Sequence, residues 1–297
     1  MRTSLRAALA LFLSLFTAVA LIAPATAAPA GQHRDGKGSS GSARSVQPLE
    51  RAHAHNDYEH TRPLLDALDQ GFTSVEADVW LVDGQLYIGH DEPDMDRTLA
   101  NTYLEPLRQQ IARNRGAVYR GYKGRFRLYI DVKSGPETWP VIERELSKFD
   151  DIVTRWEGNK RIKAPVEAVI SGARDLPAME AAKVRYSAYD GRLPDLYSGI
   201  PSEVMTVVSD NFTNNFTWRG EGPMPAAEKR KLHTIVKLAH KQGYEVRFWA
   251  TPDAPGPARD AIWRELIAAD VDQINTDDLS GLANFLKAND PTERRKK

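Results

Sequence analysis

We expect the folded part of this 297-residue chain to be a single (β/α)₈ barrel, which is an α/β fold. Short apolar or β-branched segments alternate with helical patterns, and eight such segments fit into roughly 240 residues, a usual size for this barrel. An open doubly wound sheet would show the same alternation. The first segment, however, is not followed by the G-x-G-x-x-G turn with which such sheets bind dinucleotides.

The predicted strands are short segments rich in apolar or β-branched residues, which is typical of strands buried in a parallel sheet. In chain order they cover residues 50–55, 74–80, 127–133, 167–171, 184–189, 205–209, 245–250 and 273–276. Helical patterns lie between several of them, most clearly at residues 62–70, 140–149, 176–183, 226–242 and 257–269. In the helix at 226–242, the spacing of the apolar residues predicts one buried face, and Gly243 follows where a helix often ends.

The first 28 residues have the three-part pattern of a secretory signal peptide. Arg2 and Arg6 form a short positive region, residues 7–23 are almost all apolar, and small residues follow at 25–27. The apolar run is shorter than the roughly 20 residues that a membrane-spanning helix needs. We therefore expect a cleaved signal and a secreted protein without a membrane span, rather than an anchored one.

The rest of the chain divides into three parts. Residues 29–47 are rich in Gly, Ser, Ala and Arg and lack apolar periodicity, so we expect a flexible linker. Residues 48–288 form the predicted barrel, and residues 289–297 form a polar tail.

The composition excludes several classes of function. The chain has no cysteine, which rules out a disulfide scaffold, a thiolate nucleophile and Cys-ligated zinc or iron–sulfur sites. It has 40 basic and 40 acidic residues, so its formal net charge is zero. Nucleic-acid binders usually carry a basic excess, and we therefore expect no nucleic-acid partner.

Polar side chains gather where the first predicted strands end, and in a barrel such positions are typical of catalytic sites. The segments are Ala52-His53-Ala54-His55-Asn56-Asp57-Tyr58, Glu76-Ala77-Asp78, Gly89-His90-Asp91 and Asp131-Val132-Lys133. Residues two apart on a strand share a face. The pairs that share a face are Glu76 with Asp78, Asp131 with Lys133, and His53 with His55.

Three of these residues, Glu76, Asp78 and Asp131, predict a cation site. Oxygen ligands without cysteine suit a hard divalent cation such as Mg²⁺ or Ca²⁺. The mutual repulsion of the carboxylates also requires a cation, because several buried like charges do not ionise together without one.

Histidines beside such a site can act as general acid and general base near neutral pH. Lys133 can neutralise charge on a phosphoryl oxygen. Together with the cation site, these groups predict the cleavage of a phosphodiester.

Some of these features also have structural explanations. A Glu-x-Asp pair alone fits a solvated strand face, with alternate residues in the core. His53 is expected to pack or hydrogen-bond inside the barrel, and His60 to flank a helix. His233 and His240 lie on one predicted helix, away from the predicted site.

The ordered set of motifs resembles the superfamily of phospholipase-C-like phosphodiesterases, which includes glycerophosphodiester phosphodiesterases and the sphingomyelinase D phospholipases. It comprises His55, Glu76-Ala77-Asp78, His90-Asp91, Asp96-Arg97-Thr98, Asp131-Val132-Lys133, Trp249 and Ile274-Asn275-Thr276-Asp277. The His55-Asn56-Asp57-Tyr58 segment, together with 76–80 and 86–90, more closely resembles the subfamily named after the yeast altered-inheritance-of-mitochondria protein 6.

The resemblance implies a TIM barrel and a role for each matching residue. Glu76, Asp78 and Asp131 would hold one divalent cation, Mg²⁺ or Ca²⁺, and His55 and His90 would perform acid–base catalysis. Contacts to the substrate or its phosphate would come from Lys133, Asn56 and Trp249.

The chain departs from the superfamily at several points. Asn56-Asp57 stands where glycerophosphodiesterases usually have Arg-Gly, whose arginine contacts the phosphate. The glutamate of their Pro-Glu-Asn motif has no clear counterpart in this sequence, and Glu59 is one candidate for it. The cysteine-rich loop of the sphingomyelinase D group is absent. These departures leave the phosphodiesterase chemistry in place but not the identity of the substrate.

Three functions remain open. The first is a secreted, metal-dependent phosphodiesterase acting on a glycerophosphodiester or a phospholipid headgroup, and a phospholipid substrate would bring transient contact with a membrane surface. The second is a metallohydrolase of the amidohydrolase or phosphatase type, for which His53-Ala54-His55 is the opening motif, although no histidine occurs between His90 and His233. The third is a secreted binding protein with a non-catalytic barrel.

Overall fold

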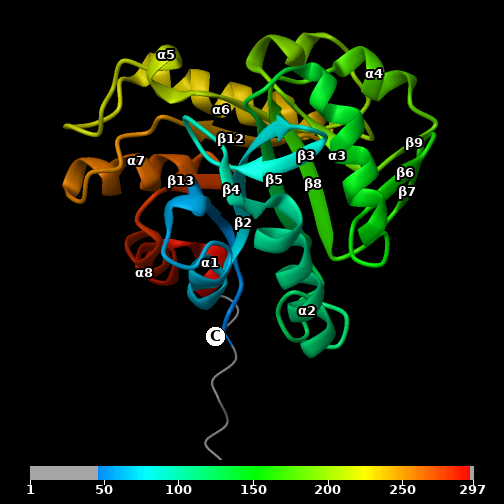
Figure 1. Ribbon diagram of the computed structural model, residues 1–297. Helices are drawn as coiled ribbons and strands as arrows, with labels where there is room; N and C mark the ends of the chain where they lie inside the picture. Colours follow the sequence, from blue (N-terminus) through cyan, green and yellow to red (C-terminus); the bar gives the residue numbers. More distant parts are fainter. Residues whose placement is uncertain (1–45, 295–297) are drawn as a thin grey trace, which may run out of the picture. The chain divides into compact units, whose positions relative to one another are not determined.

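The computed structural model describes residues 46–294, and their main feature is a closed barrel of eight parallel strands (Figure 1). The barrel strands are β1 (Leu49–Ala54), β2 (Phe72–Val82), β5 (Phe126–Val132), β8 (Val166–Gly172), β10 (Ser187–Gly191), β11 (Met205–Asn211), β12 (Glu245–Trp249) and β13 (Gln273–Thr276). Their hydrogen-bonded order is β1-β13-β12-β11-β10-β8-β5-β2, and β1 pairs with β2 to close the ring. The predicted (β/α)₈ class is confirmed.

Helices lie around the outside of the barrel (Figure 1). They are α1 (Leu65–Gln70), α2 (Glu105–Arg113), α3 (Trp139–Leu146), α4 (Leu176–Ala181), α5 (Phe212–Asn215), α6 (Ala226–Lys241), α7 (Pro257–Ala268), α8 (Leu279–Asn289) and α9 (Pro291–Arg294). In α6 the predicted apolar face is the buried one: Leu232, Ile235, Val236 and Ala239. Between β10 and β11, the connection contains only a 3₁₀ helix, η5 (Leu193–Tyr197).

The predicted strand at 184–189 is wrong as one continuous element. Its first part, β9 (Val184–Arg185), leaves the barrel and pairs with β6 (Arg155–Glu157), which in turn pairs with β7 (Lys160–Ile162). Arg185 explains the break, because its buried guanidinium lies 4.7 Å from the Trp156 ring and donates to the Ser187 and Glu203 carbonyls. The barrel strand β10 begins only at Ser187.

A hairpin that the sequence prediction lacked extends β2 beyond the barrel. β3 (Gln85–Ile88) pairs antiparallel with β2, and β4 (Asp94–Thr98) pairs with β3. The two-residue turn is Asp83-Gly84, and both residues have positive φ, 49° and 79°. Asp-Gly is a strong signal for this type of hairpin turn. The hairpin carries His90 to the C-terminal ends of the barrel strands.

The packed part of the chain continues past the predicted boundary at residue 288. Asp290, predicted from the sequence as part of a polar tail, is fully buried and accepts a hydrogen bond from Arg51 Nε at 3.1 Å. The predicted signal peptide, 1–28, and all but the last two residues of the predicted linker, 29–47, lie outside the described residues. Among the residues that are described, no helix is both long enough and apolar enough to cross a membrane.

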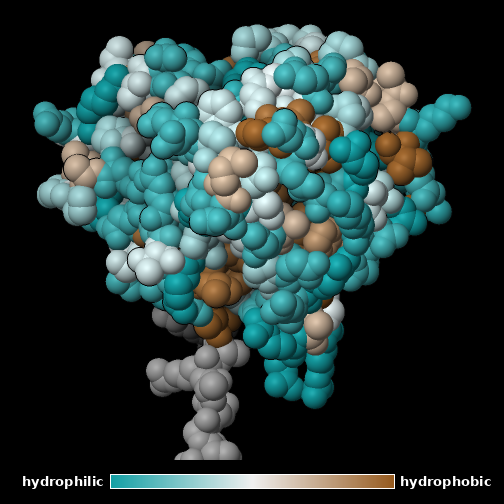
Figure 2. Space-filling model, viewed as in Figure 1, coloured by the Kyte–Doolittle hydropathy of each residue, from teal (hydrophilic) through white to brown (hydrophobic). Residues whose placement is uncertain are grey.

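The barrel interior is polar at both ends and apolar only in the middle. Because side chains alternate along each strand, the inner face of β5 carries Arg127, Tyr129 and Asp131 in sequence. A small buried cluster fills the middle: Tyr129, Trp156, Val169, Ala188 and Val207. A second and larger cluster of buried apolar side chains is separate from this one. The face of the molecule seen in Figure 2 is mostly hydrophilic, with separate apolar patches.

Candidate active site

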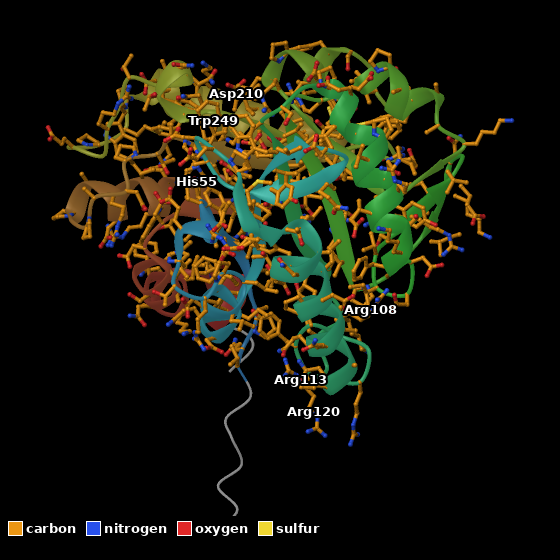
Figure 3. The ribbon with its side chains drawn as sticks, in the orientation of Figure 1. His55, Arg108, Arg113, Arg120, Asp210 and Trp249 are labelled. Carbon is orange, nitrogen blue, oxygen red and sulfur yellow. The ribbon has the colours of Figure 1, made fainter. Side chains whose placement is uncertain are left out.

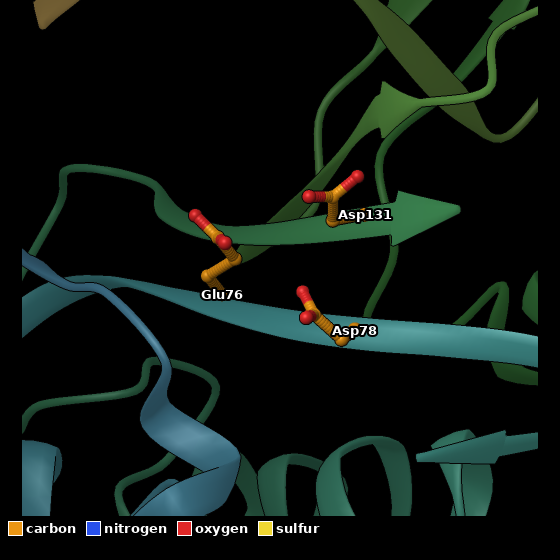
Figure 4. Close-up of side chains that lie close together, drawn as sticks. All are labelled: Glu76, Asp78 and Asp131. Carbon is orange, nitrogen blue, oxygen red and sulfur yellow. The ribbon is translucent and has the colours of Figure 1, made fainter. Parts of the chain in front are cut away.

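Three carboxylates converge at the C-terminal ends of β2 and β5 (Figure 4). The parallel register pairs Glu76 with Tyr129 and Asp78 with Asp131, so Asp78 and Asp131 lie side by side. Glu76 lies two residues before Asp78 on the same face of β2. One oxygen atom from each of Glu76, Asp78 and Asp131 lies within 4.8 Å of the others. We call these three residues the carboxylate site.

The carboxylate site has the properties of a cation site. Asp78 is fully buried, and its Oδ1 has no hydrogen-bond partner among the described residues. Burial and the negative charges of Glu76 and Asp78 raise the pKa of Asp131, while Lys133 partly opposes this rise. Three properties fit a hard divalent cation: a buried carboxylate oxygen without a hydrogen-bond partner, a carboxyl group whose pKa is raised by its carboxylate neighbours, and ligands that are all oxygen atoms.

Lys133 is in direct contact with the carboxylate site. Its Nζ lies 2.8 Å from Asp78 Oδ2 and 3.2 Å from Asp131 Oδ2. Burial alone would lower the pKa of Lys133, but the charges of Asp131 and Asp78 raise it, so the ammonium is charged. The predicted contact of Lys133 with a phosphate stays a prediction, although its position at the site agrees with it.

Gly172, at the end of β8, leaves the space that Asp131 occupies. A Cβ at this position would lie 2.0 Å from Asp131 Oδ1, and the backbone has a φ of +66°, which favours glycine. Gly172 pairs with Val132, and Ser171 pairs with Asp131. The end of β8 is therefore in direct contact with the carboxylate site.

His55 lies directly after β1, beside Glu76 (Figure 3). Its Nε2 is 3.9 Å from Glu76 Oε1, and its Nδ1 is 2.8 Å from Asp277 Oδ1. Burial alone would lower the pKa of His55, but the hydrogen bond with Asp277 and the charge of Glu76 raise it above its ordinary value. Asp277, which follows β13, orients the imidazole so that Nε2 faces the carboxylate site.

His90 approaches Asp78 from the β3–β4 loop. Its Nδ1 lies 2.8 Å from Asp78 Oδ2 and 2.9 Å from the Tyr58 hydroxyl, and its side chain is 52% exposed. The Tyr58 ring stacks against the imidazole with centroids 6.3 Å apart. His55 and His90 thus lie next to different members of the carboxylate site, Glu76 and Asp78.

Asn56 and Trp249, the other predicted substrate contacts, lie at the same end of the barrel. Asn56 has a left-handed backbone, and its Oδ1 accepts a hydrogen bond from the Tyr58 hydroxyl at 2.7 Å. Trp249 is the last residue of β12 and is half-buried (Figure 3). Their roles toward a substrate stay predictions.

His53 is buried below the site, and both of its ring nitrogens are engaged. Arg247 Nη1 donates to Nε2 at 2.8 Å, so the proton lies on Nδ1, which contacts Ser74 Oγ at 2.7 Å. Burial and the Arg247 charge lower the pKa of His53 to about 4. A neutral histidine without a free nitrogen does not provide the ligand that the amidohydrolase-type alternative requires.

Arg247 is the main residue that the sequence prediction missed. It is buried in the barrel, its Nη1 lies 2.8 Å from Glu76 Oε2, and its guanidinium lies 4.4 Å from the Tyr129 ring. Burial alone would raise the pKa of Glu76, but its neighbours, including His53 and Arg247, hold it well below its ordinary value. The available signal was an arginine two residues before Trp249 on the same face of its strand.

Tyr58 and Asp277 were also missed as members of the site. The Tyr58 hydroxyl contacts Asp78, Asn56 and His90, and Asp277 contacts His55. The remaining histidines lie in other places. His233 and His240 are exposed on α6, where His240 contacts Asp272, and His60 follows the 3₁₀ helix η1 (Asp57–Glu59).

Two family models match different parts of the chain. Residues 41–190 match the AIM6-like phosphodiesterase domain, and residues 245–280 match the glycerophosphoryl diester phosphodiesterase family. The first match contains all three carboxylates, both histidines and Lys133. The second contains Arg247, Trp249 and Asp277.

Curated relatives carry the name of the first of these families. The altered inheritance of mitochondria protein 6 homolog of Arthroderma benhamiae is 29% identical, over 82% of this chain and 85% of the relative. Altered inheritance of mitochondria protein 6 of Eremothecium gossypii is also 29% identical, over 82% of this chain and 71% of the relative. The crystal structure of a glycerophosphodiester phosphodiesterase from Agrobacterium tumefaciens is 17% identical with a TM-score of 0.47, over 81% of this chain and all of that one.

Proposed function

This chain belongs to the AIM6-like phosphodiesterase family, and we propose that it is a secreted, metal-dependent enzyme that cleaves a glycerophosphodiester or a phospholipid headgroup. The observation that supports this proposal is the convergence of the carboxylate site with two histidines. His55 Nε2 lies 3.9 Å from Glu76, and His90 Nδ1 lies 2.8 Å from Asp78. This arrangement does not serve the stability of the barrel, because it leaves one oxygen of the buried Asp78 without a hydrogen-bond partner among the described residues, and such an oxygen is costly to bury.

The proposed chemistry divides the work between the carboxylates and the histidines. A divalent cation held by Glu76, Asp78 and Asp131 would stabilise negative charge on the phosphoryl oxygens. One histidine accepts the proton of a substrate hydroxyl while the hydroxyl oxygen forms a bond to phosphorus. The other histidine gives a proton to the leaving alcohol as its bond to phosphorus breaks.

The charges at the site suit an anionic substrate once a cation is bound. Arg247 and Lys133 contact the three carboxylates, so two positive charges meet three negative ones. A divalent cation would reverse the net negative charge of this group, which suits the negative charge of a phosphodiester.

The decisive experiment combines metal removal with a substrate panel. We expect cleavage of at least one of glycerophosphocholine, glycerophosphoinositol, lysophosphatidylcholine and sphingomyelin. Exhaustive chelation should abolish that activity, and Mg²⁺ or Ca²⁺ should restore it. Full activity after chelation would contradict the proposed mechanism, and inactivity on the whole panel would favour the non-catalytic binding barrel.

Secretion and membrane contact are parts of the same proposal. Expression of the full chain should release a protein without residues 1–28 into the medium, as N-terminal sequencing of that protein will show. Retention of the uncleaved chain in the cell would contradict secretion. For a phospholipid substrate, sedimentation with vesicles should show weak, transient binding, and DNA or RNA should not bind.

A further inference from the structure

The ends of β8 and β10 form a second polar region next to the carboxylate site. Ser171 of β8 pairs with Asp131 of β5, and its hydroxyl donates to Asp190 Oδ2 at 2.9 Å. Asp190, on β10, is fully buried. Neighbouring strands lie about 4.8 Å apart, so Asp190 is only two strands away from Asp131.

Two guanidinium groups lie next to the carboxylate of Asp190, and a third contacts its backbone carbonyl. Arg192 Nη1 lies 2.9 Å from Asp190 Oδ2, and Arg247 Nη2 lies 3.7 Å from the same oxygen. Arg174 Nη1 donates to the backbone carbonyl of Asp190, to which Arg192 Nη1 also donates at 3.3 Å. Arg174 and Arg192 therefore place two guanidinium groups at this part of the barrel mouth, whereas Arg247 also pairs with Glu76. The acidic side chains beside them are Asp190, Asp195 and Asp210.

Arg174 and Arg192 have donors that the protein does not use. Among the residues that the structure describes, Arg174 forms no ion pair, and only one of its five N–H groups has a protein acceptor. The Nη2 of Arg192 lies 3.5 Å from Ser171 Oγ, the limit of a hydrogen bond, and its side chain is 26% exposed. The Arg174 guanidinium also lies 4.9 Å from the Tyr189 ring. Each of the two side chains is thus held by the protein and keeps N–H groups without a close protein acceptor among the described residues.

We propose that Arg174 and Arg192 form a phosphate-binding subsite that holds the non-bridging oxygens of the substrate's phosphodiester. The inference rests on the proposed phosphodiesterase function and adds to it the residues that bind the anion. Guanidinium groups match phosphate oxygens in geometry and charge, and they do so better when one edge is already fixed by the protein.

The subsite accounts for the departure at Asn56. Where glycerophosphodiesterases usually have an arginine that contacts the phosphate, this chain has Asn56, whose side chain is bonded to Tyr58. The two arginines lie on the other side of Asp131, just after the ends of strands β8 and β10. The arginine side chains that contact the phosphate would thus come from the other half of the barrel mouth.

Direct binding of inorganic phosphate tests the subsite without requiring activity. Calorimetric titration, with and without Mg²⁺, should give a measurable affinity for the unmodified protein. Arg192→Gln and Arg174→Gln should each weaken it by about 10- to 100-fold, the usual effect of losing a hydrogen bond to a charged group. Arg192→Lys should retain part of the affinity. Arg113→Gln, an exposed change on α2, should leave it unchanged (Figure 3).

Kinetics on the best substrate of the panel gives the second measurement. Both glutamine variants should raise KM by about tenfold or more, while bound metal stays near the value of the unmodified protein. Arg174→Gln should also leave thermal unfolding unchanged, whereas Arg192→Gln removes an ion-pair partner of the buried Asp190 and should lower the melting temperature. Phosphate affinity that is unchanged in the double variant would overturn the subsite, whatever the activity. Phosphate binding that depends on both arginines in a protein inactive on every substrate would keep the subsite and overturn the proposed catalysis.

Discussion

The two ends of the barrel hold buried charges in opposite ways. At the N-terminal ends of the strands, Glu245 accepts from Arg125 and Arg127, and the fully buried Glu167 accepts from Arg161. Each carboxylate there has a guanidinium partner. At the C-terminal ends, Glu76, Asp78 and Asp131 face one another.

The difference appears in the pKa values. Burial alone would raise the pKa of Glu245, but Arg127 and Arg125 lower it, whereas the pKa of Asp131 is raised by burial and by its carboxylate neighbours. Glu167 and Glu245 are paired with guanidinium groups inside the fold. Glu76 is likewise paired with Arg247, but it also faces Asp78 and Asp131, and this mutual repulsion of three carboxylates requires an added cation. The comparison assigns structure to one end and chemistry to the other, as is usual in this fold.

The largest effect on activity should come from the two histidines of the C-terminal end. His55→Ala and His90→Ala should each lower turnover by about 10²–10⁴-fold, because each removes a positioned proton donor or acceptor. His233→Ala, on the exposed face of α6, is the matched control and should leave turnover unchanged.

His53→Ala separates the phosphodiesterase from the amidohydrolase-type alternative. It removes a buried side chain bonded to Arg247 and Ser74, so it should lower the melting temperature while bound metal is retained. Loss of metal in His53→Ala, combined with full metal content in Asp131→Ala, would reverse the assignment of the site.

Glu167→Gln tests the structural role of the N-terminal end. It leaves the half-buried Arg161 without its charged partner, and losing a hydrogen bond between charged groups typically costs about 1.5–3 kcal/mol. Denaturant unfolding should show this loss, while metal affinity measured by calorimetry should not change. A weakened metal site in this variant would mean that the two ends are not independent.

Asp78→Asn should produce the reverse pattern at the C-terminal end. It removes a ligand charge and relieves carboxylate repulsion, so metal affinity should fall by roughly tenfold or more, while stability without metal changes little. Metal titration and denaturant unfolding on the same protein measure both quantities. Unchanged affinity would exclude Asp78 as a ligand.

The smallest predicted effect concerns Asp57, whose pKa burial raises to about 7 from an ordinary value of 3.8. The folded state then holds a proton that the unfolded state releases, so the contribution of Asp57 to stability is full below about pH 4 and is lost as the pH rises toward 7. The expected slope is roughly 1 kcal/mol per pH unit. Asp57→Asn keeps an acceptor for the Leu64 N–H and should flatten this part of the curve. An unchanged slope in unfolding experiments between pH 5 and 7 would show that Asp57 is ionised in the fold.

The sequence was sufficient to predict the barrel and the convergence of the three carboxylates, because both follow from local patterns. Strand alternation decides which side chains face inward, and parallel strands bring their C-terminal ends together. The same kind of local pattern could have predicted the Asp83-Gly84 hairpin. The break at Arg185 was not, because it depends on a contact with Trp156 in a separate small sheet.

Arg247 shows most clearly what local patterns leave out. It lies 171 residues from Glu76 in the chain, and only closure of the ring between β12, β13, β1 and β2 brings the two together. Spacing along the sequence shows that Arg247 faces inward. It does not show which buried carboxylate it will meet, and the same holds for Asp277 and His55.

The Asp83-Gly84 hairpin fixes the distance between a carboxylate and a histidine by strand register. Gly89 N donates to Asp78 O at 3.2 Å, and Trp80 Nε1 donates to Gly89 O at 2.8 Å, so His90 is held opposite the carboxylate site by main-chain pairing. Insertions that lengthen the exposed turn keep that pairing and are tolerated. A slip of one residue in β3 would instead turn alternate side chains to the opposite face. The hairpin can therefore accept a tag or label at its tip, whereas its strands accept no change in length.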